Sequence, residues 1–124
     1  MLPTLLTAYA QLVRFEHFLL RRDFQGLYQV VRNQPVNSVR CPRPSVEQIC
    51  RAVDMACVWY WRRVLCLQRS AVTVCLLKRA GIRACLVIGV QQTPFRAHAW
   101  VEIDGRVVND REYLPTMYSI LDRC

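Results

Sequence analysis

A cysteine, a histidine and an aspartate that could act together in nucleophilic catalysis occur in this order at Cys66, His98 and Asp110. A cysteine thiolate attacks carbonyl carbon, and a histidine can take the thiol proton and later give it to a leaving group. A carboxylate that binds the histidine orients the ring and stabilises its charged form. If the fold brings these side chains together, they predict a thiol-dependent acyl-transfer site.

Cys66 is distinguished from the other cysteines by its place in a predicted helix. Apolar residues at helical spacing predict a helix over residues 66–80, with Gly81 directly after its end. Cys66 then stands at the N-terminus of this helix, where unpaired N–H groups and the helix dipole favour a thiolate. The alternative is a small core residue, which is the usual role of a free cysteine.

The seven cysteines do not form a metal or disulfide pattern. They occupy positions 41, 50, 57, 66, 75, 85 and 124, and no two have C-x-x-C spacing, so a zinc site is not expected. Their odd number and the lack of a secretory signal argue against a disulfide framework. The thiol chemistry itself requires no cofactor.

His98 lies on a strand predicted over residues 97–103, between two alanines that leave its ring approachable. The other histidine, His17, lies among apolar residues of the first predicted helix and is interpreted as a packed or boundary residue. Considered by itself, His98 could equally be a core histidine. Its joint occurrence with Cys66 and Asp110 favours the functional interpretation.

A hairpin predicted at Asp104-Gly105 folds Asp110 back toward His98. A strict two-residue turn would place Asp110 opposite Ala99, whereas a three-residue loop or a bulge would place it opposite His98. The geometry therefore allows a His98–Asp110 hydrogen bond without requiring one. The competing carboxylates are Asp104, about 20 Å from His98 along the strand, and Glu102, about 13 Å away.

The elements that must position these residues indicate an α+β domain. Helices are predicted over residues 4–24, 45–61 and 66–80, strands over 84–90, 97–103 and 106–109, and a short helix over 113–121. Ser45 and Gln48 form a capping box at the start of the second helix. Residues 26–44, with a short helical or extended piece at 27–32, are interpreted as a linker. The expected organisation is an N-terminal helical arm, residues 1–44, and a core, residues 45–124.

Composition and charge limit the classes of protein to which the chain can belong. The chain has 124 residues, 53% hydrophobic and 21% charged, which excludes a disordered chain and is typical of one domain. Its apolar runs are too short to span a membrane, and residues 1–13 lack the features of a signal peptide, so a cytoplasmic protein is expected. Residues 1–80 carry 12 basic and 4 acidic groups, and residues 81–124 carry 5 of each. The basic half could face an acidic partner.

The sequence resembles a known enzyme family in several motifs. They are Cys66-Leu67-Gln68-Arg69-Ser70, Leu76–Ile82, Leu86–Val90, Pro94–Glu102, Asp104-Gly105 and Asn109-Asp110. The order of cysteine at a helix start, histidine on a strand and aspartate after it is that of papain-like and transglutaminase-like thiol enzymes. Over residues 45–115 the chain resembles the leader peptidases of lasso peptide biosynthesis, which are bacterial thiol proteases of the transglutaminase-like superfamily.

This resemblance implies a papain/transglutaminase-like core with Cys66 as nucleophile, His98 as general base and acid, and Asp110 as the orienting carboxylate. It implies a ribosomally made precursor peptide as substrate, cut between leader and core, and an ATP-dependent cyclase that later closes the ring. Residues 1–44 are too short for the fused leader-recognition domain of some members, so a separate leader-recognition protein is expected.

Two other functions remain open from the sequence. A transglutaminase-type acyl transferase would resolve the same thioester with an amine instead of water. A catalytically silent module would use the basic half to bind a peptide or nucleic acid, although nucleic acid is the less expected partner.

Overall fold

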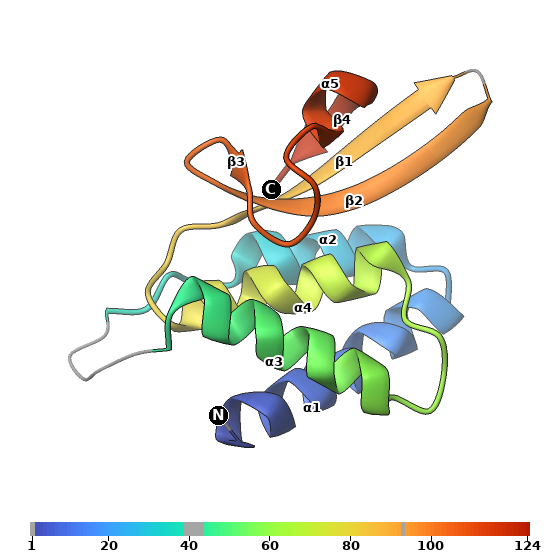
Figure 1. Ribbon diagram of the computed structural model, residues 1–124. Coiled ribbons are helices and arrows are strands. Elements are labelled where there is room, and N and C mark those ends of the chain that lie inside the picture. The colour runs from blue at the N-terminus through green and yellow to red at the C-terminus, as the bar shows by residue number, and fades with distance from the viewer. Residues whose placement is uncertain (1, 39–43, 93) are drawn as a thin grey trace.

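Helices and a four-stranded antiparallel sheet form two layers of the protein (Figure 1). The computed structural model describes residues 2–38, 44–92 and 94–124. The elements are α1 (Leu2–Leu20), α2 (Phe24–Asn33), α3 (Val46–Trp59), α4 (Cys66–Arg79), β1 (Cys85–Gln92), β2 (Phe95–Ile103), β3 (Arg106–Val107), α5 (Leu114–Met117) and β4 (Ser119–Arg123). This confirms the predicted α+β class.

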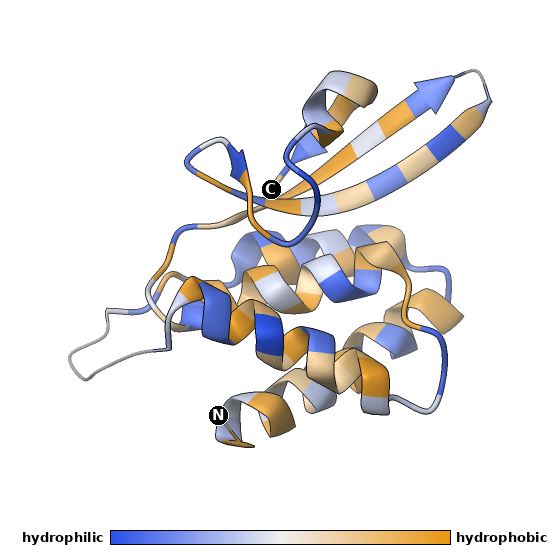
Figure 2. Cartoon of the chain, viewed as in Figure 1, coloured by the Kyte–Doolittle hydropathy of each residue, from blue (hydrophilic) through white to orange (hydrophobic). Residues whose placement is uncertain are grey.

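The main hydrophobic core lies between the helices and one face of the sheet, with α4 in the middle (Figures 1 and 2). Its fully buried side chains include Ala8, Leu12 and Phe15 of α1, Ile49 and Val53 of α3, Val74 and Leu77 of α4, and Leu86 and Val101 of the sheet. Because α1 contributes to the same core and packs against α3 and α4, the predicted helical arm lies on the predicted core and does not stand apart from it.

The opposite face of the sheet carries a smaller cluster under α5. Val87, Trp100, Val107 and Leu114 are buried there, and Tyr118 packs against them. Successive residues of a strand point to opposite faces. Trp100 therefore faces α5, whereas its neighbours on β2, Ala99 and Val101, belong to the main core.

The segment predicted as a linker contains a helix. The sequence analysis expected at most a short piece at residues 27–32, but α2 spans Phe24–Asn33. Asp23 caps this helix by accepting a hydrogen bond from the Gly26 N–H at 2.9 Å. Leu27 and Val31 are buried in the main core. Tertiary burial of these two side chains therefore overcomes the helix-weakening effect of Gly26.

The predicted C-terminal helix over residues 113–121 is mostly wrong. Only the single turn α5 is helical, and the chain then forms β4, which pairs antiparallel with β1. The sheet order is β3-β2-β1-β4, so β4 covers the edge of β1 that the hairpin leaves open. Pairing at this edge satisfies backbone groups of both strands, and that gain depends on a partner distant in sequence.

The hairpin turn is confirmed as a two-residue turn. Asp104 and Gly105 have φ angles of 51° and 79°, as a type I′ turn requires. Glu102 pairs with Val107 and Ile103 with Arg106. The returning strand β3 ends at Val107, however, and does not extend to residue 109 as predicted.

None of the helices in the described ranges is long and apolar enough to cross a bilayer.

Candidate active site

The start of α4 has free backbone donors. Cys66 is the first residue of this helix, and Leu65 precedes it at the N-cap position without a side-chain cap. In contrast, the start of α3 is closed by the predicted capping box, in which Ser45 and Gln48 bond each other's backbone. The N–H groups of the first turn of α4 therefore remain available to an anionic group beside Cys66.

Four other cysteines are held as neutral thiols. Burial raises the pKa of Cys75 and of Cys124 to about 11. It also raises the pKa values of Cys50 and Cys57. A thiol with a raised pKa is protonated near neutral pH and is a poor nucleophile. These four cysteines are suited to packing, and Cys41 lies outside the described residues.

His98 and Asp110 form a short hydrogen bond. His98 Nε2 lies 2.8 Å from Asp110 Oδ2, and each side chain is 26% exposed. Burial acts to raise the pKa of Asp110, but hydrogen bonds from His98 and the Arg111 N–H, with the nearby charges of His98 and Arg69, lower it overall.

The low pKa of Asp110 fixes the roles of the two ring nitrogens of His98. A carboxylate only accepts hydrogen bonds, so Nε2 carries the proton and donates it to Asp110. In the neutral ring Nδ1 then has the free electron pair. This nitrogen is the one that can accept a proton from a nucleophile.

Neither of the two predicted strand registers describes the backbone path that brings Asp110 to His98. The turn has two residues, which in a continued strand would set Asp110 opposite Ala99. The chain instead leaves the strand after Val107, and the Asn109 side chain takes the place of the next strand residue by accepting from the Val101 N–H at 2.8 Å. Asp110 can then turn toward His98.

Two aromatic rings pack near the His98 imidazole. The Tyr118 ring is stacked on it at 5.9 Å and 28°, and the Trp100 ring lies at 6.1 Å and 30°. Gly89 pairs with His98 across β1 and β2. A Cβ atom at Gly89 would lie 2.6 Å from Trp100 Cη2 and 2.7 Å from Tyr118 Cβ. Sequence reasoning missed these three residues, because Tyr118 was assigned to a helix and Gly89 had no visible partner.

The competing carboxylates do not bind His98. Asp104 is exposed at the hairpin turn. Glu102 is 4% exposed and accepts hydrogen bonds from Trp100 Nε1 at 2.9 Å and Arg123 Nε at 3.4 Å. Gln68, two residues after Cys66, is buried and donates to the Leu12 carbonyl at 2.7 Å, which directs it into the α1–α4 interface.

Helix α4 is anchored to β2 beside the histidine. Ser70, one turn after Cys66, donates to the Ala99 carbonyl at 3.2 Å. Figure 1 shows the start of α4 beneath the middle of β2. Among the described residues no hydrogen bond joins Cys66 to His98. The structure thus brings His98 and Asp110 into contact and fixes the Cys66 helix next to β2, the strand of His98.

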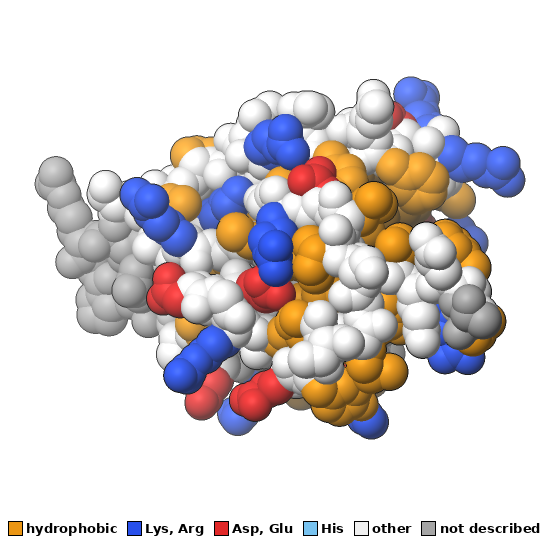
Figure 3. All heavy atoms as spheres, turned by 90° about the horizontal axis from the view of Figure 1, so that it is seen from above, with side chains coloured by type: hydrophobic (Ala, Val, Ile, Leu, Met, Phe, Trp, Pro, Cys, Tyr) orange, Lys and Arg blue, Asp and Glu red, His pale blue; other side chains and the backbone are white. Residues whose placement is uncertain are grey.

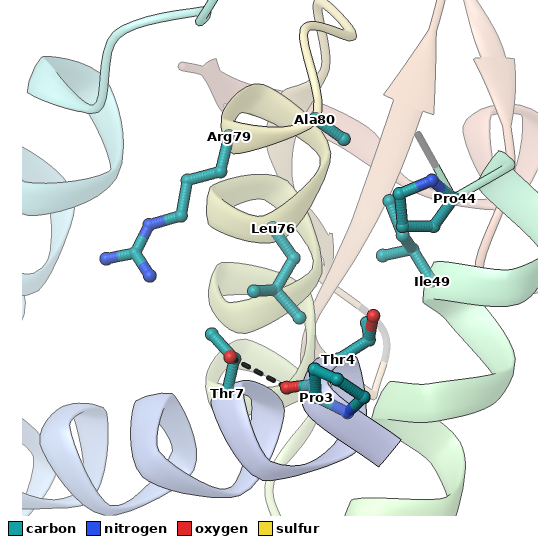
Figure 4. A pocket seen from close by; sticks show the side chains of 8 residues that line it. All are labelled: Pro3, Thr4, Thr7, Pro44, Ile49, Leu76, Arg79 and Ala80. Atoms are coloured by element: carbon teal, nitrogen blue, oxygen red, sulfur yellow. Dashed lines mark hydrogen bonds between the residues drawn. The ribbon is translucent and has the colours of Figure 1, made fainter. Parts of the chain in front are cut away.

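Pockets lie at both ends of α4. One of about 330 Å³ lies at its C-terminal end, away from Cys66, and is lined by Pro3, Thr4, Thr7, Pro44, Ile49, Leu76, Arg79 and Ala80 (Figure 4). Another, of about 350 Å³, adjoins the N-terminal end and is lined by Glu16, Leu19, Leu20, Arg62, Arg63, Leu65 and Gln68. Two residues that line the second pocket, Leu65 and Gln68, lie close to Cys66 in the sequence.

Charge on the face above the sheet is mixed. Figure 3 shows arginine side chains spread over this face with acidic side chains between them. Such a distribution lacks the continuous basic stripe typical of a nucleic-acid surface. No group of three or more His, Cys, Asp or Glu side chains in the described segments is arranged to hold a metal ion.

Comparisons with known proteins identify the family of the chain. The microcin J25-processing protein McjB of Escherichia coli is 39% identical over 56 residues, which are 45% of this chain and 27% of that protein. No solved structure matches the chain significantly. The sequence profile of the Transglutaminase-like superfamily matches residues 9–122, which is nearly the whole chain. The protein therefore belongs to the transglutaminase-like superfamily.

Proposed function

We propose that the protein is a cysteine peptidase that removes the leader from a ribosomally made lasso precursor peptide, with Cys66, His98 and Asp110 as its catalytic residues. The observation that carries this proposal is the 2.8 Å bond from His98 Nε2 to Asp110, which leaves Nδ1 free as a base on the strand beside the Cys66 helix. The similarity to McjB supports peptide processing as the reaction class.

The proposed reaction begins with transfer of the Cys66 proton to His98 Nδ1. The thiolate attacks the carbonyl carbon of the scissile peptide bond, and the backbone N–H of Cys66 stabilises the oxyanion. His98 then protonates the leaving amine, which breaks the C–N bond and leaves a thioester on Cys66. Water, deprotonated by His98, attacks the thioester and releases a carboxylate and the free thiol.

The proposed partners follow from the same function. The substrate is the precursor peptide, which a separate leader-recognition protein presents to the peptidase. An ATP-dependent lasso cyclase would use the peptide released by cleavage. The chemistry uses only side chains and backbone groups of this chain and water.

Replacement of Cys66 tests the proposal directly. Cys66→Ala should abolish cleavage of the precursor, measured by mass spectrometry, with little change in melting temperature, because Cys66 is only half-buried. The control is Cys75→Ala, which should keep most of the activity and lower stability by about 1–2 kcal/mol, because Cys75 is fully buried. An active Cys66→Ala protein would refute the thiol-peptidase mechanism.

The superfamily also favours a second candidate, a transglutaminase-type acyl transfer. An amine would then attack the thioester, so the product would be joined instead of split. The same mass spectra distinguish the two reactions. A protein that binds the precursor but forms neither product would be a silent binding module.

A further inference from the structure

The edge of β2 next to His98 is completed by side chains in place of a strand. In an antiparallel sheet, every second residue directs both its N–H and its C=O to the same edge. Beyond the end of β3, the Val101 carbonyl still accepts from the Val108 N–H at 3.0 Å. The Val101 N–H then donates to Asn109 Oδ1, and the Ala99 carbonyl accepts from Ser70.

These side chains form one connected network with α4. Asn109 Nδ2 donates to Ser70 Oγ at 3.1 Å, and Ser70 is 1% exposed. Arg69 Nη2 donates to the Asn109 carbonyl at 3.0 Å and forms an ion pair with Asp54 of α3 at 2.8 Å. Asn109 therefore has its backbone carbonyl and both side-chain polar atoms occupied, which leaves its orientation little freedom.

We propose that Asn109, held by Arg69 and Ser70, is the positioning residue that sets Asp110 against His98. In a continuing strand, the Val108 carbonyl would accept a hydrogen bond from the Val101 N–H. The Asn109 side chain accepts this bond instead. The backbone is therefore free to leave the strand before it reaches Asp110. Asp110 follows directly and reaches Nε2 of His98. The catalytic part of this inference rests on the proposed function, whereas the geometric part does not.

The same network links the predicted nucleophile to the His98–Asp110 pair. Arg69 and Ser70 lie within the first turn and a half of α4, which begins at Cys66. A contact that fixes these two residues to Asn109 also fixes the helix start relative to β2. The Arg69 charge additionally contributes to the lowered pKa of Asp110, so Arg69 helps to keep the carboxylate ionised.

Asn109→Ala tests the proposal with two measurements. The turnover number with precursor and leader-recognition protein should fall about 100-fold with little change in KM, because the catalytic pair would be displaced by about 1 Å. In ¹H–¹⁵N NMR spectra, the His98 Nε2–H signal, shielded from exchange by Asp110 in the wild type, should broaden or vanish. A His17→Gln background assigns this signal, because only two histidines occur.

Two further variants separate positioning from folding. Asn109→Asp keeps the acceptor for Val101 and loses the donor to Ser70, so it should retain more of the NMR signal and of the turnover number than Asn109→Ala. Asn33→Ala, at an exposed residue of α2, should change neither. If Asn109→Ala does not fold, Asn109→Asp and Ser70→Ala replace it in the test, and the turnover number and the His98 Nε2–H signal are measured in the same way.

The outcomes distinguish this inference from the proposed function. If the wild-type protein does not cleave the precursor, the proposed peptidase function is refuted. If its His98 Nε2–H signal is nevertheless lost in Asn109→Ala, the positioning role of Asn109 is upheld. Variants that lose only melting temperature, with the signal and the turnover number unchanged, would overturn the positioning role and leave the peptidase intact.

Discussion

At the scale of single residues, the partner of His98 decides which ring nitrogen can react. Asp110 binds Nε2, so the free electron pair is on Nδ1. The sequence named both residues and allowed their contact, but it could not show that Asn109 would replace a strand residue and make the contact possible.

Replacing Asp110 should therefore impair catalysis through His98. Asp110→Asn can donate to Nε2 and so favours the wrong tautomer, and we expect the turnover number to fall by roughly 10²- to 10⁴-fold. The loss should be smaller than in His98→Ala. Asp104→Asn is the matched control, because Asp104 is exposed at φ 51°, which asparagine tolerates. A damaging Asp104→Asn would contradict the assignment.

The pKa of Asp110 predicts a pH dependence of stability. Because folding lowers the pKa of this carboxyl below its ordinary value of 3.8, the ionised carboxylate stabilises the folded state above pH about 4. That contribution is lost as the pH falls through the lower folded pKa. Melting temperatures of wild type and Asp110→Asn should therefore differ at pH 6 and converge toward pH 2. A constant difference across this range would show that the pair does not stabilise the fold.

At the scale of elements, β4 and α5 complete the surroundings of His98. The pairing of β4 with β1 brings Tyr118 over the imidazole, and Trp100 packs beside it. Gly89 permits this arrangement, because any side chain there would enter the space of the Trp100 ring and of the Tyr118 Cβ atom.

Gly89→Ala should displace these rings and weaken the site. We expect a loss of about 1–3 kcal/mol in the free energy of unfolding from overpacking, measured by urea denaturation, with a clear decrease in turnover number. Gly105→Ala is the control, since it strains the backbone at φ 79° without any neighbour within 4 Å. It should cost about 1 kcal/mol with turnover nearly unchanged. Equal effects on turnover would argue against a role of the ring stack.

At the scale of the whole molecule, α1 presents two different faces. One face supplies Ala8, Leu12 and Phe15 to the main core. The other leaves Leu6, 62% exposed, and Leu20, 64% exposed, without a covering element in the described residues. The exposed Arg14, Arg21 and Arg22 lie on the same helix or at its end. This surface is where we expect the leader-recognition protein to dock.

Charge reversal on α1 tests this expectation. Changing Arg14, Arg21 and Arg22 to Glu should strongly reduce the cleavage rate measured with the recognition protein and leave the slow rate without it unchanged. The physical reason is effective concentration, because a docked partner holds the scissile bond near Cys66. Reversal of the exposed Arg51, Arg83 and Arg106 is the matched control. Equal loss of both rates would mean that α1 supports only the fold, and full activity without a partner would refute the two-protein arrangement.

The sequence by itself determined the elements whose signals are local. The capping box at Ser45, the helix beginning at Cys66 and the Asp104-Gly105 turn depend on neighbouring residues, and all three are confirmed. It also singled out His98 and Asp110, which the structure brings together. The catalytic roles of Cys66, His98 and Asp110 remain predictions.

The tertiary structure decided the features that depend on distant partners. Residues 119–123 form a strand because the edge of β1 offers backbone hydrogen bonds. The helix α2 forms over its full length because Leu27 and Val31 are buried in the main core. Asn109 completes the edge of β2 because α4 supplies Ser70 on the other side. In each case the free energy comes from a contact between segments far apart in the chain, which local propensity and periodicity do not contain.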